Sequence, residues 1–529
     1  MPTPTASTSF HGAVAAPHAA ATEAAVAAYR DGGSAIDAAI AAAAVLTVVY
    51  PHNVALGGDL IALVRTPDGA VTCVNASGWA AAAVDVPALR GRHGTALPVR
   101  GADTVTVPGG VRGWEALRGF GSRLDWSRLL EPAQRIAHDG VEVPQSLATH
   151  LADPENADLI GVDDFAAVFC PAGRALTAGE ELRQPALAQT FAALRSGGPE
   201  EFYAGELGRR SVQYLQDHGS AVTPADFADF TADITAPIAV DFRGLTVWTS
   251  PPNSHGFAML RALRAIADLG IGAPLGADVP TLMQLFRQGN ALRDRYLADP
   301  RMAAVDVSAL LSTDVPAATG HAQAGSLAVP AGDTVGVAAA DSDGVAVSLI
   351  QSVYHAFGSG LVDPQTGILF HDRGTGFDLD PRSPNVVAGR KRPRHTLMPA
   401  LTTENGALRH VLATMGGQGQ PQILTQILLR LLDGAGAAQA VAAPRAIVGR
   451  QTLHSTDDSV VVEEDFDQAA TAALTDSGLD LVAVPASGES SGQANVVTVD
   501  RDGALTAATD PRSDGAASVV HYVRHRRAG

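Results

Sequence analysis

The sequence predicts an α/β protein in which helices pack on mainly antiparallel sheets. Strand pairs joined by short turns occur toward both ends of the chain, helical periodicity dominates the middle, and the two kinds of segment alternate. With 529 residues, 46% of them hydrophobic, the chain is large enough to bury a substantial core. A chain of this length is usually divided into two or so domains, although single domains of this size exist.

Residues 19–50 are predicted to form two alanine-rich helices. Gly32 and Gly33 separate them, and Ser34 is a suitable N-cap for the second helix, with Asp37 three residues later. Their apolar faces indicate close packing against another layer, which we expect to be a sheet. Two adjacent strands, LGGDLIALV and AVTCVNAS, should follow, joined by a Pro-Asp-Gly turn.

The middle of the chain is predicted to be mostly helical. Helical periodicity extends from about Trp114 to Gly219, with breaks such as GVEVPQ, and again from Phe257 to Leu297. The segment from Asp314 to Gly332 is small, polar and rich in Gly and Pro, so we expect an exposed loop there.

Beyond this loop the pattern changes to β. The segment DTVGVAAADSDGVAVSLIQSVYHAF, Asp333 to Phe357, has two alternating stretches around a Ser-Asp-Gly turn and predicts a hairpin. GILFHD, LMPALTTENGALRHVLATMGG and ANVVTVDRDGALTAATD also have β character, and one helix is expected at Pro421 to Leu432. Strand pairs at both ends of the chain favour antiparallel sheets in layers over a doubly wound parallel sheet.

Composition restricts the class of partner. The formal net charge is −18 and the basic residues are scattered, which argues against a nucleic-acid surface, because phosphate binding relies on clustered Lys and Arg. Cys73 and Cys170 are far apart and form no CxxC pair, so we expect two small core residues rather than a disulfide or a zinc site.

No targeting or membrane-spanning segment is expected. The chain has no basic residue before Arg30 and no apolar core in front of a cleavage site. The longest apolar run, Ala38 to Tyr50, is shorter than the roughly 20 residues that a membrane helix requires. We therefore expect a cytoplasmic protein without membrane contact.

Three short motifs have simpler interpretations than catalysis. GESSG, Gly488 to Gly492, fits the serine-hydrolase pattern GxSxG, but that pattern requires a following helix and a strand is expected here, which favours a loop. Gly57-Gly58 and Gly416-Gly417 match neither a dinucleotide fingerprint nor a P-loop and, considered alone, indicate tight turns or close backbone approach. None of the 16 histidines forms HExxH or a close His/carboxylate cluster, so we expect no metal and no cofactor.

Thr334 stands at a special place in the order of segments. A threonine that begins a strand is usually only a β-former. Here it follows an exposed loop, so the peptide bond before it is accessible, and its hydroxyl could attack the preceding carbonyl. Cleavage would give Thr334 a free α-amine with a reference pKa of about 7.7 to 8.0, able to accept the hydroxyl proton. One residue would then supply both nucleophile and base.

Ordered segments over nearly the whole chain resemble the γ-glutamyltransferases, a family of N-terminal-nucleophile hydrolases. The matching pieces are DGGSAIDAAIAAAAVLTVVYPHNVALGGDL, TVTVPGGVRGWEAL, FYAGELG, AVDFRGLTVWTSPPNSHG, FGSGLVDPQTGILFHDRGTGFDLDP, KRPRHTLMPAL, MGGQGQPQ and AATDPRSDGAA. The resemblance implies an αββα sandwich and a self-cleaving proenzyme. Residues 1–333 would be the large subunit and residues 334–529 the small one, intertwined in one domain as a heterodimer. Whether two heterodimers associate stays open.

The same resemblance implies the catalytic residues. Thr334 would be the nucleophile and the new amino terminus, and the bond between Asp333 and Thr334 the cleavage site. Ser352 matches a family threonine that hydrogen-bonds the active threonine. Gly416 and Gly417 match a glycine pair whose backbone N–H groups form the oxyanion hole. Preorganised donors of this kind stabilise the charge of a tetrahedral intermediate by roughly 3 kcal/mol each.

The substrate side departs from the family pattern. γ-Glutamyl enzymes hold the donor's α-amino and α-carboxylate groups with an Asn after the second hairpin strand, an Asp before a Phe, a Ser-Ser pair and an Arg. The matching positions are Tyr354, Gly376 and His395-Thr396, and the segment GWAAAAVDVPAL offers no Arg. The carboxylate that would pair with an α-ammonium is absent. A pocket lined by Tyr354, Arg373, His395 and Thr396 suits a carboxylate without an adjacent amine, although Arg373 could equally form a structural ion pair.

The sequence therefore predicts an autoprocessed amidohydrolase or acyltransferase from a divergent branch, similar to members that act on oxamate or on cephalosporin side chains. Thr334 would attack a small-molecule amide with an oxalyl-like or γ-glutamyl-like acyl group, and water or an amine would resolve the acyl-enzyme. Two alternatives stay open. One is biosynthetic acyl removal by C–C cleavage of an α-keto acid, and the other is an uncleaved, non-catalytic binding protein.

Overall fold

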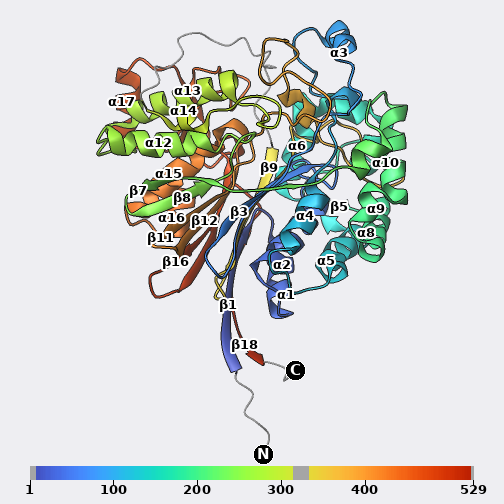
Figure 1. Ribbon diagram of the computed structural model, residues 1–529, viewed down its shortest axis with the longest axis horizontal. Coiled ribbons are helices and arrows are strands. Elements are labelled where there is room, and N and C mark those ends of the chain that lie inside the picture. The colour runs from blue at the N-terminus through green and yellow to red at the C-terminus, as the bar shows by residue number, and fades with distance from the viewer. Residues whose placement is uncertain (1–6, 314–332, 526–529) are drawn as a thin grey trace, which may run out of the picture.

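Two antiparallel sheets lie face to face, and helices cover the outer face of each, in a computed structural model that describes residues 7–313 and 333–525 (Figure 1). The seven-stranded sheet has the spatial order β18 (Ala516–His525), β1 (Ser7–Ala16), β9 (Asp333–Asp341), β10 (Ala346–Tyr354), β2 (Asp59–Arg65), β3 (Val71–Ala76) and β6 (Asp233–Thr235). The six-stranded sheet has the order β17 (Leu505–Thr509), β16 (Gln493–Val499), β12 (Ala407–Met415), β11 (Ala400–Glu404), β8 (Leu245–Thr249) and β7 (Ile238–Phe242). This arrangement confirms the expected αββα layering.

The first helical layer rests on the seven-stranded sheet. Helix α1 (Ala19–Arg30) packs on α2 (Ala35–Val49), and α2 lies against β9 and β10. Every residue of α2 is buried, which explains its alanine content, because small side chains let neighbouring elements approach from all sides. The other helices of this half are α3 (Val86–His93), α4 (Gly110–Arg118), α5 (Trp126–Asp139), α6 (Gln145–Ala152), α7 (Asp163–Phe169), α8 (Pro185–Gly197), α9 (Glu200–Tyr203), α10 (Glu206–Asp217) and α11 (Pro224–Ala228), with a small strand pair β4 (Val141–Glu142) and β5 (Glu181–Leu182).

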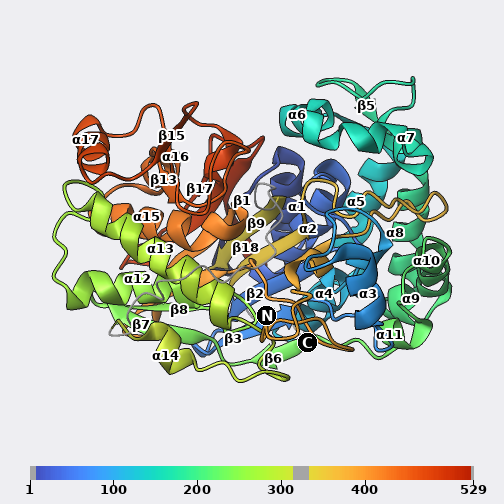
Figure 2. The same cartoon turned by 90° about the horizontal axis from the view of Figure 1, so that it is seen from above.

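The second helical layer covers the six-stranded sheet, on the opposite side of the molecule (Figure 2). It contains α12 (Phe257–Asp268), α13 (Val279–Tyr296), α14 (Val307–Leu311), α15 (Gln420–Leu432), α16 (Ala437–Ala442) and α17 (Gln468–Asp476). A three-stranded sheet adjoins it, formed by β13 (Ala446–Val448), β14 (Val460–Glu463) and β15 (Leu481–Val484), in which β14 and β15 are parallel. Among the helices of the described residues, none has the length and apolar character that a bilayer span requires.

Strands from before and after Thr334 pair with each other in both sheets. Strand β9 pairs with β1 on one side, and β10 pairs with β2. In the second sheet β11 pairs with β8, which again joins the two halves of the sequence. Strands β12 and β16 pack across β9, so the first residues of β9 lie at the centre of the sandwich.

Several sequence predictions are confirmed and others are wrong. The two helices within residues 19–50, the strand pair after them and the hairpin at β9 and β10 are all present, and the Asp37 carboxylate accepts hydrogen bonds from the backbone N and the Oγ of Ser34. GILFHD forms isolated bridges rather than a strand. Only one helix was predicted after the hairpin, at Pro421 to Leu432. The structure has two more, α16 and α17, in the segment that also forms the three-stranded sheet. The predicted loop from Asp314 to Gly332 lies outside the described residues.

Candidate active site

The hydroxyl of Ser352 joins Thr334 to the peptide bond that precedes it. Thr334 is the second residue of β9 and is buried. Its Oγ1 donates to Ser352 Oγ at 3.1 Å, and Ser352 Oγ donates to the carbonyl oxygen of Asp333 at 2.6 Å. The backbone N–H of Tyr354 donates to the same Oγ at 2.8 Å. Ser352 thus uses its one donor on the carbonyl and accepts twice, which is the full capacity of a hydroxyl.

A glycine directly before the neighbouring strand β2 makes room for this serine. Ser352 lies opposite Asp59 in the register of β10 and β2. A Cβ added to Gly58 would lie 2.4 Å from the carbonyl oxygen of Ser352, far inside van der Waals contact. The expectation that the Gly57-Gly58 doublet marks close backbone approach is therefore confirmed.

Gly416 and Gly417 follow the end of β12, across the sandwich from the start of β9. Both have positive φ, 141° and 48°, a conformation that glycine adopts without strain. A Cβ on Gly336, two residues after Thr334, would lie 2.7 Å from the backbone nitrogen of Thr414, so the two strands nearly touch there. Gly416 lines the same cleft as Asp333. The fold therefore brings the glycine pair to the neighbourhood of the Asp333–Thr334 peptide.

Arg373 is buried against two of the other predicted substrate residues. Its guanidinium carbon lies 3.4 Å from the centroid of the Tyr354 ring, and its Nη1 donates to Thr396 Oγ1 at 3.4 Å. A Cβ on Gly376 would lie 2.3 Å from Arg373 Nη2, so the guanidinium fills the space that a side chain at position 376 would take. Within the described residues Arg373 forms no ion pair with a carboxylate, and its Nε has no partner.

Tyr354 has φ of 84°, in the left-handed region that a bulky side chain rarely adopts and that Asn tolerates far better. Stacking on a desolvated guanidinium, worth up to about 2 kcal/mol, offsets part of that cost.

His395 lies beside Asp59 rather than beside the Arg373 guanidinium. Its Nε2 donates to Asp59 Oδ2 at 3.1 Å and its Nδ1 accepts from the backbone N–H of Leu397 at 3.2 Å. This pattern describes a neutral imidazole, and burial lowers the pKa of His395 to about 4 in spite of the carboxylate. The Oδ1 atom of Asp59 accepts a hydrogen bond from the backbone N–H of Gly78 and lies 3.5 Å from Nδ1 of His371.

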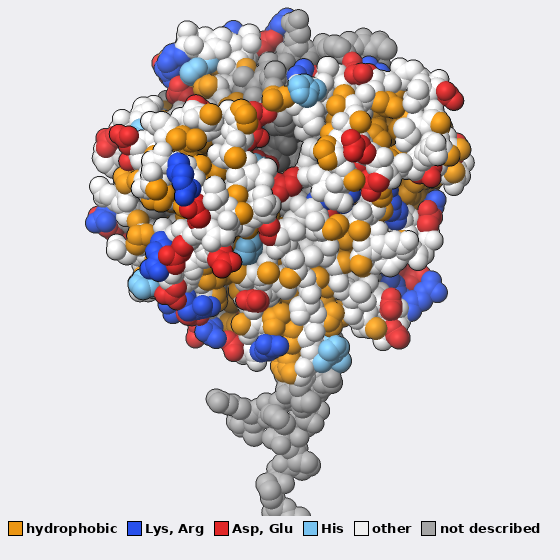
Figure 3. Space-filling model, turned by 180° about the vertical axis from the view of Figure 1, so that it is seen from behind, with side chains coloured by type: hydrophobic (Ala, Val, Ile, Leu, Met, Phe, Trp, Pro, Cys, Tyr) orange, Lys and Arg blue, Asp and Glu red, His pale blue; other side chains and the backbone are white. Residues whose placement is uncertain are grey.

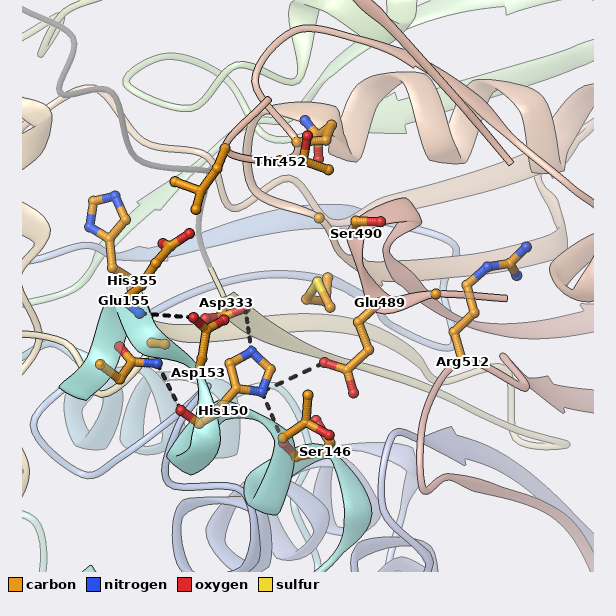
Figure 4. Close-up of a pocket in the computed structure, with 18 of the residues that line it drawn as sticks. Ser146, His150, Asp153, Glu155, Asp333, His355, Thr452, Glu489, Ser490 and Arg512 are labelled. Carbon is orange, nitrogen blue, oxygen red and sulfur yellow. Dashed lines mark hydrogen bonds and ion pairs between the residues drawn. The ribbon is translucent and has the colours of Figure 1, made fainter. Parts of the chain in front are cut away.

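A cleft of about 1020 Å³ opens beside the Asp333–Thr334 peptide. Figure 3 shows a hollow bordered by Asp and Glu side chains, and Figure 4 shows the interior of the cleft. The acidic residues that line it are Asp153, Glu155, Asp158, Asp333, Glu489 and Asp514. Tyr354, Arg373, His395 and Thr396 do not belong to this lining; Arg373, His395 and Thr396 are buried, and Tyr354 is partly exposed.

Three of the residues around Thr334 were not singled out by the sequence. Asp59 is a single polar residue in an otherwise apolar stretch, His150 lies among other polar residues in QSLATHLA, and Glu489 belongs to GESSG, which sequence reasoning assigned to a loop. The turn Glu489–Ser491 is indeed followed by β16, which confirms that assignment, but the turn carries Glu489 into the cleft. The position of Asp59 directly after the Gly57-Gly58 doublet could have indicated a functional residue in the sequence.

In the part of the chain that the structure describes, no group of three or more His, Cys, Asp or Glu side chains is placed to hold an ion. Cys73 and Cys170 are both buried and unpaired, as expected.

Comparisons with known proteins identify the fold and the family. The layered αββα architecture is that of the N-terminal-nucleophile hydrolases, and the crystal structure of a cephalosporin acylase from Bacillus halodurans superposes with a TM-score of 0.87 at 30% identity, covering 98% of this chain and 97% of that one. The sequence signature described as Gamma-glutamyltranspeptidase matches residues 21–520. The chain belongs to the gamma-glutamyltranspeptidase family.

Two curated relatives cover nearly the whole chain. The oxamate amidohydrolase proenzyme of Klebsiella pneumoniae is 37% identical over 525 residues, 96% of this chain and 98% of that protein. The glutathione hydrolase-like YwrD proenzyme of Bacillus subtilis is 36% identical over 517 residues, 95% of this chain and 97% of that protein. The chain is therefore an enzyme of the amidohydrolase and acylase type.

Proposed function

We propose that the chain cleaves itself before Thr334 and then hydrolyses amides of a small acyl group that carries a carboxylate but no adjacent amine. In self-cleavage, Thr334 Oγ1 bonds to the carbonyl carbon of Asp333, the C–N bond breaks, and the hydroxyl proton passes to the Thr334 nitrogen. Water then hydrolyses the ester, which leaves a carboxylate on Asp333 and restores the hydroxyl of Thr334. The Ser352 hydrogen bond to the Asp333 carbonyl supports this step, because negative charge develops on that oxygen.

In the processed enzyme the freed α-amine takes the proton of the Thr334 hydroxyl as it attacks the substrate amide. The leaving amine receives that proton, and water releases the acyl group from Thr334. Gly416 and Gly417 would donate their backbone N–H groups to the oxyanion, which suits their position at the end of β12.

The proposed choice of substrate rests on the buried side chain of Arg373. A buried charge that no carboxylate balances costs several kcal/mol, and this cost favours a role for Arg373 in binding an anion. The Tyr354 ring packs on one face of the guanidinium, which leaves the N–H edge for a carboxylate. Tyr354 pairs with Asp333 across β10 and β9, and its ring packs on the guanidinium, so Tyr354 connects Arg373 to the strand pair that holds the scissile bond. An α-ammonium would be repelled there, because the guanidinium fills the space beside Gly376.

Oxamate fits this description, because its carboxylate adjoins the amide and its hydrolysis gives oxalate and ammonium. We propose water as the preferred acceptor and a heterodimer of residues 1–333 and 334–529 as the active unit. Association of two such heterodimers and a cytoplasmic location stay predictions from the sequence. Amide hydrolysis is preferred to C–C cleavage because of the similarity to an oxamate amidohydrolase proenzyme.

Steady-state kinetics with an arginine variant tests this proposal. Arg373→Met should lower kcat/KM for oxamate about 100-fold through loss of a charged bidentate contact, and the exposed Arg382→Met should leave it unchanged. Thermal stability of Arg373→Met should change little, because removal of a buried charge without a carboxylate offsets the lost stacking on Tyr354. Efficient turnover of a γ-glutamyl anilide by the wild type, or an unaffected Arg373→Met, would contradict the proposed substrate class.

A further inference from the structure

His150 lies between two carboxylates in the cleft, on the last turn of α6 (Figure 4). Its Nε2 is 3.5 Å from Asp333 Oδ1, and its Nδ1 is 2.9 Å from the carbonyl oxygen of Ser146 and 3.8 Å from Glu489 Oε2. A carbonyl oxygen can only accept, so Nδ1 carries a hydrogen. We assign a second hydrogen to Nε2, because its lone pair would otherwise face the Asp333 carboxylate, and the ring is then an imidazolium.

The surroundings of the ring support its positive charge. Burial opposes the charge, but the carboxylates of Asp333 and Glu489 outweigh it and raise the pKa of His150 to about 10. The stacked neighbour His52, at 4.6 Å between ring centroids, has a pKa far below its ordinary value because it is buried, so it adds no competing charge near neutrality.

Asp333 is thereby held from two directions. Its carbonyl oxygen accepts a hydrogen bond from Ser352 on β10, and its side chain is paired with His150 on α6. The carbon between these two anchor points is the one that Thr334 would attack. Attack requires the reacting atoms to be close and aligned, and a displacement of about 1 Å can cost roughly 100-fold in rate.

We propose that His150 is a positioning residue for self-cleavage: its imidazolium holds the Asp333 carboxylate and so fixes the scissile carbonyl between Ser352 and Thr334. This inference rests on the proposed self-cleavage at Thr334. It assigns a function to the side chain of the residue before the nucleophile, and it makes the rate of maturation depend on an ion pair within residues 1–333.

A double-mutant cycle tests the pairing. Full-length chains of His150→Gln, Asp333→Asn and the double variant are made by cell-free synthesis, synthesis is stopped, and loss of the uncleaved chain is followed by denaturing electrophoresis. Each single variant should cleave roughly 10- to 100-fold more slowly than the wild type. The double variant should be no slower than the singles, because both remove the same contact. His150→Lys, which keeps the positive charge, should recover part of the rate.

An exposed His–Asp pair elsewhere in the chain serves as the matched control. His138 and Asp139 on α5 form an ion pair at 2.9 Å and are largely exposed, so His138→Gln and Asp139→Asn should cleave at the wild-type rate. Wild-type cleavage rates in either His150→Gln or Asp333→Asn, or slowing in the double variant equal to the product of the two single effects, would overturn the inference. If the wild type itself stays intact, or Thr334→Ala is cleaved, the proposed function fails instead.

Discussion

At the scale of single residues, the Ser352 hydroxyl organises the chemistry that we propose. It receives the hydrogen of Thr334 Oγ1 and donates its own to the carbonyl of Asp333, so nucleophile and electrophile share one contact. Arg373 illustrates the opposite condition, a buried charge that the described residues leave without a carboxylate. We interpret the first as part of the self-cleaving machinery and the second as the binding site of a substrate anion.

Replacement of Ser352 should affect cleavage much more than folding. Ser352→Ala removes the donor to the Asp333 carbonyl, and we expect self-cleavage to slow about 100-fold, the usual cost of losing one oxyanion donor. Ser352→Thr keeps the hydroxyl and should cleave within roughly tenfold of the wild type. Ser348→Ala, on the same strand, removes a buried hydroxyl that donates to Leu412 O at 2.7 Å and should leave the rate unchanged. A time course of intact mass checks all three variants, and normal cleavage by Ser352→Ala would contradict the assigned role.

At the scale of elements, the position of β9 determines where Thr334 and the glycine pair meet. The strand is paired on both edges and covered by α2 on one face and by β12 and β16 on the other. The close contact at Gly336 is what allows β12 to lie against it. The geometry of the candidate site therefore depends on a residue that takes no part in the chemistry.

Gly336→Ala tests this dependence. The added Cβ would lie 2.7 Å from Thr414 N and 2.9 Å from Ala413 C, atoms of a central strand that cannot move aside. We expect a loss of about 2 to 3 kcal/mol of stability and slower self-cleavage, because β9 is forced away from β12. Gly272→Ala is the control, since its Cβ would meet no atom within 4 Å. Unfolding followed by circular dichroism, together with cleavage rates, measures both effects. Equal stability of the two variants would show that the contact is not tight.

Local signals explain which elements the sequence predicts. Ser34 and Asp37 mark the start of a helix. The hairpin around Ser-Asp-Gly places Ser352 opposite the start of its partner strand. Both features follow from residues that are close in the sequence. Strand β1 has a weak pattern of small and polar residues and becomes a central strand only through pairing with β18 and β9. Strands β13 to β15 have three or four residues each, too short for a periodic signal. Likewise His150 and Glu489 reach Asp333 only through the tertiary fold.

At the scale of the whole molecule, strand pairing joins residues before and after Thr334, and a buried ionic network stabilises the part that follows Thr334. Arg445 and Arg512 are fully buried and pair with Asp510 and Glu463, which link the three-stranded sheet to β16 and β17. Removal of one partner from such a network typically costs 3 to 5 kcal/mol, because a buried charge is left alone. Extensive pairing between residues before and after Thr334 would keep the two products of cleavage together.

Stability should fall as the pH drops below neutrality. Burial lowers the pKa of His395 and of His410 to about 4 and holds those of His52 and His255 well below the ordinary value. In the unfolded chain these histidines titrate near 6.5, so between pH 6.5 and 4 the unfolded state binds more protons. Their contribution is complete above pH 6.5 and is lost as the pH falls toward 4, by up to about 1.4 kcal/mol per pH unit for each group.

Thermal unfolding between pH 6.5 and 4.5 checks this expectation. The carboxyls of Glu155, Asp341 and Glu489 have raised pKa values, so their protonation favours the folded state as the pH falls. These three groups are fewer than the four buried histidines. His410→Gln should make the pH dependence less steep, whereas the exposed His138→Gln should not change it. A melting temperature that stays constant or rises as the pH falls from 6.5 to 4.5 would show that the buried histidines do not govern acid stability.

The intact mass of the purified protein tests whether the chain cleaves itself before Thr334. The wild type should give two fragments, one with the 333 residues that precede Thr334 and one with the 196 residues from Thr334 to Gly529, whose amino-terminal sequence reads TVGVAA. Thr334→Ala should give a single chain of about 54.2 kDa. A wild-type protein that remains one chain, or a Thr334→Ala protein that yields the same two fragments, would contradict the account.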